Sequence, residues 1–246
     1  MKKITTALAL STMVIFASVT SSPASTVLTI KNSKKVSSSE ERQVSGFKGI
    51  SSSGSFDVKI TMGNKENLRL EGDEDVIKEI ETVVENGILK IRNKNRNGWK
   101  WNSTKGKVTI YVNAKTLNSI TQSGSGDMDI SGLVKAGRLT TNLSGSGSIS
   151  LTADADEYLG SISGSGEIEV KGKADRATVK LSGSGDFEGK GLKTQEADIR
   201  ISGSGNASIS ADKNLDAAVS GSGNIRYSGN AQVSKTKSGS GSISKM

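Results

Sequence analysis

The stretch SGSGDMDISG, from Ser123 to Gly132, begins with a tetrapeptide that recurs at a nearly constant spacing. The other copies of S-G-S-G begin at Ser144, Ser163, Ser182, Ser202, Ser220 and Ser238. Consecutive copies lie 18 to 21 residues apart, and a flexible linker has no reason to keep such a period. Self-similarity at a fixed period is typical of repeat proteins, so the chain is predicted to stack units of about 19 residues.

Apolar side chains keep one alternating phase on both sides of each tetrapeptide. Around the fifth copy, the residues of one parity are Ile199, Ile201, Gly203, Gly205, Ala207 and Ile209. Because successive side chains of a strand point to opposite faces, the glycines fall on the inner side and the serines on the outer side. Glycine also permits a sharp bend. Each repeat is therefore predicted as two short strands joined by a bend with inward glycines, in an all-β, single β-helix or solenoid.

Stacked coils also predict ladders of equivalent residues. One internal ladder is expected to contain Met128, Ile149, Ile168, Phe187, Ala207, Ile225 and Ile243. The serines are expected to form two outward rows, which either fill a crowded bend with small hydroxyls or offer a flat polar strip to glycans. In the last coil the inward positions include Lys235, Lys237 and Lys245, so we expect that coil to be frayed, with its lysines in solvent.

The segment before the regular coils is less regular. Residues 117–246 are predicted as the regular S-G-S-G coils, and residues 45–116 as an irregular N-terminal part of the same solenoid. The irregular part is expected to contain a degenerate first coil at Ser53–Ser55, a hairpin turn at Asn86-Gly87 and one short helix within 73–81. It is expected to cap the solenoid, because an open coil would present unpaired strand edges. Residues 25–44, rich in serine and charge, are predicted to be a flexible lead.

The first 24 residues have the pattern of a secretory signal peptide. Lys2 and Lys3 precede an apolar run from Ile4 to Val19, and the small residues Ser22 and Ala24 suit a cleavage site. No cysteine lies nearby, which excludes a lipoprotein anchor, and no later segment is long enough for a transmembrane helix. The sequence therefore predicts export to the periplasm, the cell surface or the medium.

The formal charge is +8, and loss of Lys2 and Lys3 with the signal would leave about +6. Such a charge is compatible with anionic glycans, lipid headgroups or nucleic acid. Export argues against nucleic acid, so the expected partners are glycans or other anionic components of the envelope or cell surface. The oligomeric state is left open.

Three segments together resemble the head GIN domain family of auto-transporter adhesins. They are FKGISSSGSFDVKI, VVENGILKI and KVTIYVNAKTLNSITQSGSGDMDISG, within a match from Phe47 to Tyr227. The most specific part is the alternation around S-G-S-G after Leu117 and Ile120. The resemblance implies a β-helical solenoid similar in outline to pectin-lyase-type folds, without recognisable catalytic residues and with a role in cell-surface adhesion. The sequence ends at Met246 without a coiled-coil stalk or membrane barrel, so we expect the chain not to anchor itself by that route.

The composition excludes several enzyme classes. The chain has no histidine and no cysteine, which removes the usual general base, the thiol nucleophile and the commonest zinc ligands. No G-x-S-x-G elbow activates a serine. No catalytic residue and no cofactor are therefore predicted, and the chain is expected not to be an enzyme.

Carboxylate pairs are the one pattern that favours catalysis. The pairs are Asp127 with Asp129, Glu167 with Glu169, and Asp186 with Glu188. β-Helical glycosidases use paired acids, but these have the outward parity, where a raised pKa is hard to obtain. Solvated charge on the sheet is the favoured interpretation.

A calcium site is not expected either. In glycine-rich nonapeptide solenoids an aspartate binds the ion, but the equivalent positions here are the inward Met128, Ile149, Ile168 and Phe187. A loosely held ion at Asp154, Asp156 and Glu157 is left open, and no metal site is predicted.

The segment KIRNKNRNGWKWNSTKGK, at 90–107, is the strongest candidate for binding. It has seven basic residues, two tryptophans and no acid, which suits an anionic surface. The candidate surface-binding residues are Arg92, Lys94, Arg96, Trp99, Lys100 and Trp101. The alternative is a long hairpin whose tryptophans cover the end of the solenoid.

These features predict an exported, non-enzymatic β-solenoid that serves as an adhesion or interaction module at the cell surface or envelope. A cryptic carbohydrate-active enzyme of pectin-lyase-like fold and a purely structural envelope protein are the alternatives.

Overall fold

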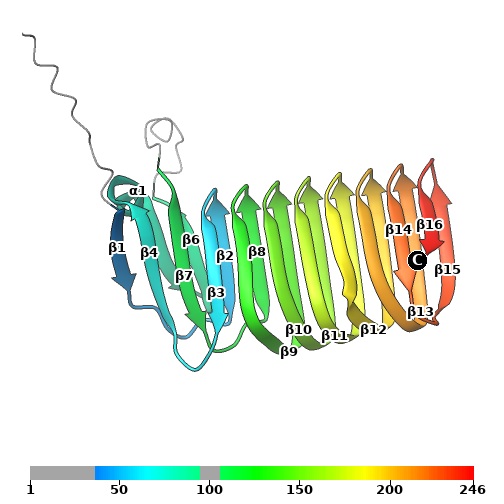
Figure 1. The fold of residues 1–246 in the computed structure, drawn as a ribbon, viewed down its shortest axis with the longest axis horizontal. Coiled ribbons are helices and arrows are strands. Elements are labelled where there is room, and N and C mark those ends of the chain that lie inside the picture. The colour runs from blue at the N-terminus through cyan, green and yellow to red at the C-terminus, as the bar shows by residue number, and fades with distance from the viewer. Residues whose placement is uncertain (1–36, 95–105) are drawn as a thin grey trace, which may run out of the picture. The chain divides into compact units, whose positions relative to one another are not determined.

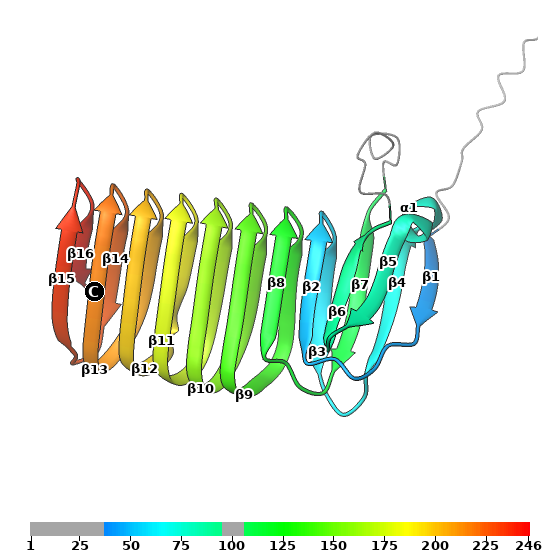
Figure 2. The same cartoon turned by 180° about the vertical axis from the view of Figure 1, so that it is seen from behind.

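The computed structural model describes residues 37–94 and 106–246, and almost all of this part is β-strand. One short helix, α1 (Glu74–Glu79), interrupts the strands within it. The strands form a 16-stranded sheet that winds into a solenoid (Figure 1, Figure 2). The predicted all-β solenoid with coils of about 19 residues and one short helix is confirmed.

In the regular coils, equivalent strands run parallel and in register. Each long strand runs along one face, turns at the lower edge in Figure 1 and returns along the other face to the S-G-S-G bend. We call the edge with these bends the bend edge. The first face carries the residues just after each bend, and the second face those just before it. The strands are β8 (Ser119–Gly124), β9 (Asp127–Gly145), β10 (Ser148–Gly164), β11 (Glu167–Gly183), β12 (Asp186–Gly203), β13 (Asn206–Gly221), β14 (Asn224–Ser228), β15 (Gln232–Ser238) and β16 (Ser242–Lys245).

The predicted internal ladder is present on the first face. Its residues, from Met128 to Ile243, are direct partners in successive strands. All of them except the half-buried Ile243 are buried. Val58 of the first coil extends the ladder beyond Met128. The apolar alternation therefore predicted both the inward face and the register.

The two glycines of each bend have different roles. Gly203 has a φ of +134°, which side-chain-bearing residues rarely adopt, and a Cβ there would lie 2.2 Å from the carbonyl oxygen of Gly183. Gly205 is buried, and its Cβ would lie 2.1 Å from the carbonyl oxygen of Gly185. The expectation of inward glycines holds for the second position. The first is half-buried and is required by its backbone angle and by the adjacent coil.

The phenol of Tyr158 is fully buried in the mostly aliphatic core. The hydroxyl of Tyr158 lies 2.5 Å from the Thr141 hydroxyl, which satisfies its hydrogen-bonding capacity. The Tyr158 ring stacks on Phe187 with centroids 6.0 Å apart. Burial raises the pKa of Tyr158, so the phenol stays neutral and its role is packing.

The first coil is built out of chain order. It consists of β2 (Gly49–Gly54) and β3 (Asp57–Met62), which pair with β8 and β9 on one side. On the other side they pair with β6 (Ile88–Asn93) and β7 (Val108–Ala114), although these strands come later than β3 in the chain. Ser53 and Gly54 are in register with Ser123 and Gly124, which confirms the degenerate first coil.

Antiparallel strands cover the N-terminal end of the solenoid. Strand β4 (Asn67–Asp73) pairs with β7, and β5 (Ile80–Glu85) pairs with β6. The predicted turn between β5 and β6 is present, because Asn86 and Gly87 both have positive φ, as a type I′ turn requires. Helix α1 starts after Asp73, whose side chain accepts a hydrogen bond from the backbone of Asp75, and it buries Val76 and Ile77. The predicted short helix is thus found, and the parallel coils end here in antiparallel strands.

Residues 37–42 are not the flexible lead that the composition predicts. They form β1 (Ser37–Arg42), which pairs antiparallel with β4 along its whole length. Its sequence SSSEER has no apolar alternation, so the strand is held by backbone hydrogen bonds and by Arg42. The Arg42 guanidinium donates to the Ile80 and Ile77 carbonyl oxygens at 2.8 and 3.2 Å. The rest of the predicted lead before Ser37, and the predicted signal peptide, lie outside the described residues.

The expectation that the last coil is frayed is wrong. Strand β15 pairs with β13, and β16 pairs with β14. Lys235, Lys237 and Lys245 are nevertheless exposed, as predicted. Lys235 donates to the Ile243 carbonyl oxygen at 3.2 Å and lies over the Tyr227 ring, 5.0 Å from its centroid. The coil therefore stays ordered because none of the three lysines enters the core, and Lys235 lies over its end.

The bend geometry predicts a sharp difference between adjacent positions. Gly203→Val should lower the free energy of unfolding by about 2–4 kcal/mol, because it adds both backbone strain and a clash with the previous coil. Ser204→Ala, at the exposed neighbouring position, should change it by less than about 0.5 kcal/mol. Urea unfolding of both variants measures the difference. Equal effects would contradict the stacking geometry at the bend edge.

Candidate functional site

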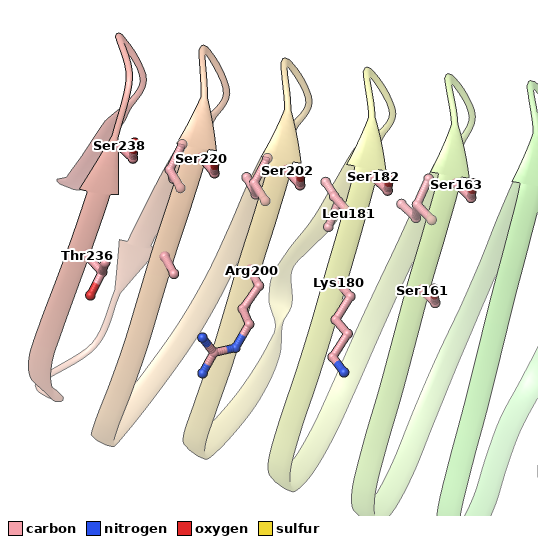
Figure 3. A pocket seen from close by; sticks show the side chains of 14 residues that line it. Ser161, Ser163, Lys180, Leu181, Ser182, Arg200, Ser202, Ser220, Thr236 and Ser238 are labelled. Atoms are coloured by element: carbon pink, nitrogen blue, oxygen red, sulfur yellow. The ribbon is translucent and has the colours of Figure 1, made fainter.

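A shallow groove of about 470 Å³ lies on the second face beside the bend edge. Figure 3 shows it crossing neighbouring strands, so its long direction follows the solenoid axis. Two outward rows of side chains line it. The row nearer the bends consists of Ser163, Ser182, Ser202, Ser220 and Ser238. The second row consists of Ser161, Lys180, Arg200, Ala218 and Thr236.

The hollow follows from the outward sequence of the coils. The outward serine, alanine and threonine side chains are short, so the surface is hollowed where they lie. Their inward neighbours Ile162, Leu181 and Ile201 are buried and pack the strands against the core. The in-register pairing repeats each row from coil to coil at about 4.8 Å. The result is a rigid, mostly apolar surface with a row of hydroxyl groups at regular intervals beside the bends.

The charged side chains that line the groove are both cations. Lys180 and Arg200 are direct partners on β11 and β12, and both are exposed. The Arg200 guanidinium forms ion pairs with Asp198 at 3.1 Å and with Asp216 at 3.6 Å, and neither carboxylate lines the groove. Lys180 makes no ion pair within the described part of the chain. The groove can therefore offer a free ammonium and an oriented guanidinium to an anionic group.

The first face is acidic beside the same edge. Glu167 and Glu169 on β11 are in register with Asp186 and Glu188 on β12. Burial, followed by the charges of Glu188, Asp186 and Glu169, raises the pKa of Glu167.

Other carboxylates of the first face accept hydrogen bonds from the neighbouring coil. Asp127 accepts from the Ser148 backbone and hydroxyl at 3.0 and 2.8 Å, and Asp186 accepts from Asn206 at 2.9 Å. The Glu188 carboxylate accepts from the Ser208 hydroxyl at 2.9 Å. These carboxylates are outward, as the sequence predicts, and several serve to connect neighbouring coils.

The loosely held calcium ion finds no support in the geometry. Asp154 pairs with Lys173 at 3.3 Å, and Glu157 pairs with Arg138 at 2.6 Å. Across residues 37–94 and 106–246, no group of three or more acidic side chains is arranged to hold a metal ion.

The structure describes two of the six residues predicted to bind surfaces. Arg92 lies on β6 and pairs with Glu81 at 2.6 Å and with Glu85 at 3.5 Å. The hydrogen bond that it donates to the Glu81 carboxylate is the main cause that raises the pKa of the guanidinium. Lys94 follows β6 and donates to the Lys78 carbonyl oxygen of α1. Arg92 is therefore already neutralised by neighbouring carboxylates. Arg96, Trp99, Lys100 and Trp101 lie outside the described residues.

The two strands that flank the basic segment are both described. Strand β6 pairs with β2, and β7 pairs with β3, so together they are equivalent to the two strands of a coil. The end of β6 and the start of β7 thus lie beside the end of β2 and the start of β3, at the bend edge.

Sequence reasoning predicted the outward serine row but missed the groove and its two basic residues. The outward residues of the second face were available as a signal, because Lys180 and Arg200 occupy the same position in consecutive repeats. These two residues indicate a groove only because the side chains around them are small. That can be recognised only when the sequences of five coils are aligned side by side.

Residues 46–231 match the family model described as "Putative auto-transporter adhesin, head GIN domain". This span covers most of the chain and all coils with an S-G-S-G bend except the last. The chain belongs to the head GIN domain family. The predicted resemblance is thereby confirmed, with nearly the boundaries that the sequence suggests.

Solved structures of similar proteins agree with this membership. A protein from Parabacteroides distasonis described as a "putative lipid binding protein" is 30% identical, with a TM-score of 0.70 over 85% of this chain and 96% of the other. A "putative adhesin" from Bacteroides fragilis is 24% identical, with a TM-score of 0.76 over 86% and 98%. One from Parabacteroides merdae is 21% identical, with a TM-score of 0.65 over 85% and 96%. The last two support the fold alone.

Two further findings complete the comparison. No curated protein is significantly similar to this head GIN chain. Within the described residues, no helix has the length and apolar character needed to cross a membrane.

The carboxylates of the first face predict a pH effect on stability. Because the pKa of Glu167 is higher in the folded chain than in the unfolded chain, the folded state binds more protons. Its contribution is greatest below the ordinary pKa of 4.5 and is lost as the pH rises through the raised pKa. Glu167→Gln should therefore flatten the dependence of unfolding free energy on pH in this interval.

Denaturant unfolding across the acidic range measures that slope. Asp175→Asn, at an exposed carboxylate away from this cluster, is the matched control and should leave the slope unchanged. The same slope in wild type and Glu167→Gln would show that Glu167 does not carry the effect.

Proposed function

We propose that this head GIN protein is an exported, non-enzymatic adhesion module that attaches to glycans or other anionic components of the cell surface or envelope. The observation that carries the proposal is the groove on the second face, where Lys180 and Arg200 lie on consecutive coils beside a row of serine hydroxyl groups. A rigid surface of this kind loses little conformational entropy on binding. It suits repeated weak contacts with a polymer or a crowded surface better than enclosure of a small molecule.

Location forms part of the same proposal. The pattern of residues 1–24 supports export through a signal peptide, to the periplasm, the cell surface or the medium. Family membership supports adhesion as the general role. The 30% identical relative described as a "putative lipid binding protein" makes lipid headgroups a second source of the anionic groups.

The carbohydrate-active enzyme is the alternative that the acidic face keeps open. Its carboxylates are exposed or half-exposed, and Asp127, Asp186 and Glu188 make hydrogen bonds that connect coils. Such contacts favour a structural role over general acid catalysis. Turnover of a polysaccharide that is lost on Asp127→Asn or Asp186→Asn would favour the enzyme instead. If the chain binds no surface at all, the purely structural envelope protein would be the favoured alternative.

The basic segment gives the adhesion proposal a separate test. Changing Trp99 and Trp101 together to alanine should weaken attachment to vesicles that contain phosphatidylglycerol, because aromatic and cationic side chains together suit an anionic surface. Charge reversal at Lys94 and Arg96 should remove the salt dependence of attachment. Co-sedimentation at low and high salt measures both effects, with phosphatidylcholine vesicles as the neutral control. Unchanged attachment by folded variants would show that the segment only covers the end of the solenoid.

A further inference from the structure

We propose that the groove on the second face binds an extended acidic polysaccharide that lies along the solenoid axis, across strands β10 to β13 and β15. This inference rests on the proposed adhesive function and gives it a ligand class and a location. The ligand would contact the serine row with its hydroxyl groups, and its carboxylates would meet Lys180 and Arg200 (Figure 3).

The direction of the ligand follows from the stacking of the coils. The groove crosses five coils, and equivalent side chains repeat at about 4.8 Å along the axis. A ligand that makes the same contact with each coil must itself be extended and repetitive. The groove volume of about 470 Å³ is within the ordinary range for ligand sites, so it would hold only a short part of a polymer at one time.

The charge of the ligand follows from the two basic side chains. No acidic residue lines the groove, while Lys180 and Arg200 lie side by side on adjacent strands. Asp198 and Asp216 hold the Arg200 guanidinium from the side away from the bends, which limits its motion. Lys180 makes no ion pair in the described segments, so its ammonium is available to a ligand. A carboxylate could bridge the two cations and receive hydrogen bonds from both.

The hydroxyl row favours a sugar polymer as the carrier of these carboxylates. Each serine can donate and accept a hydrogen bond, which matches the mixed donors and acceptors of sugar hydroxyls. The methylene stems of Lys180 and Arg200 supply apolar surface beside the polar row.

A lipid membrane fits the groove less well. The large hydrophobic side chains exposed in the described chain are Leu133 and Met246, and neither lines the groove. Attachment to a membrane surface is usually strengthened by apolar side chains that enter the lipid. Most of the groove surface is apolar, but none of it belongs to a large exposed side chain that could enter the lipid. A polysaccharide, whose rings present apolar C–H faces beside their hydroxyl groups, is therefore the better partner.

The test is calorimetric titration of the folded chain with oligogalacturonate, with neutral dextran oligomers as the uncharged comparison. Lys180→Glu should weaken binding by about tenfold, because it replaces an attractive charge by a repulsive one. Its matched control is Lys193→Glu, an identical charge change at an exposed lysine on β12 outside the groove. The control should bind within about twofold of wild type, as expected for a charge beyond the contact surface.

A steric pair tests the groove without changing charge. Ser202→Trp places a large ring in the serine row and should also weaken binding by about tenfold or more. Ser204→Trp, at the exposed bend of the same coil and outside the groove lining, should bind like wild type. Far-ultraviolet circular dichroism and thermal unfolding verify that all four variants are folded, and Ser220→Trp replaces Ser202→Trp if that variant is not.

The outcomes separate this inference from the general proposal. Unchanged binding in both Lys180→Glu and the folded tryptophan variant would overturn the groove as the site. Wild-type binding to phosphatidylglycerol vesicles but not to oligogalacturonate, lost in Lys180→Glu, would overturn the polysaccharide and assign the groove to headgroups. If the wild-type chain attaches to the vesicles but not to the sugar, and Lys180→Glu attaches equally well, other residues carry the attachment. That result would overturn this inference but not the adhesive function. Failure to bind either probe would contradict the adhesive function as well.

Discussion

The close approach of neighbouring coils at the bend edge is the contact on which the rest of this solenoid depends. At each bend the carbonyl oxygen of one glycine occupies the space where a Cβ of the next coil's glycine would lie, as for Gly183 beneath Gly203. Two glycines are required in every bend, one for its positive φ and one for its burial. Because the coils approach so closely there, the strands before and after each bend are in register, and equivalent residues form continuous rows.

Those rows give each face its own chemistry. Inside, the ladder from Met128 to Ile243 fills the narrow core with mostly aliphatic side chains, and Phe187 stacks on the buried Tyr158. On the first face, burial and then the charges of neighbouring carboxylates raise the pKa of Glu167. On the second face, small residues leave a groove in which Lys180 and Arg200 are the charged groups. Each surface is determined by the residue type at one or two outward positions of every repeat. Substitutions at these positions can therefore change a surface without altering the core.

The regular coils were predictable from sequence because parity and period act on every residue. The alternation through Gly203 and Gly205 gave the inward face, and the spacing of the tetrapeptides gave the register. The reversed order of the first coil was not predictable, since the pairing of β2 with both β6 and β8 depends on long-range contacts that no local pattern encodes. Strand β1 was not predicted for a related reason. Its sequence is polar, and the strand is stabilised by the Arg42 side chain and by backbone pairing with β4. The candidate basic residues were found by composition, whereas the groove required neighbouring coils to be compared.

The most direct test of the account is the rise per coil along one outward serine row. The chain has no cysteine, so spin labels can be placed on single cysteines at Ser123 and a second row position. Ser202 is four strands and Ser238 six strands from Ser123 along the ladder. At about 4.8 Å per strand, pulsed electron paramagnetic resonance should give narrow distances near 19 Å and 29 Å, within the reach of the label linkers. Broad distributions, or distances that do not increase from Ser202 to Ser238, would contradict a solenoid of stacked, in-register coils.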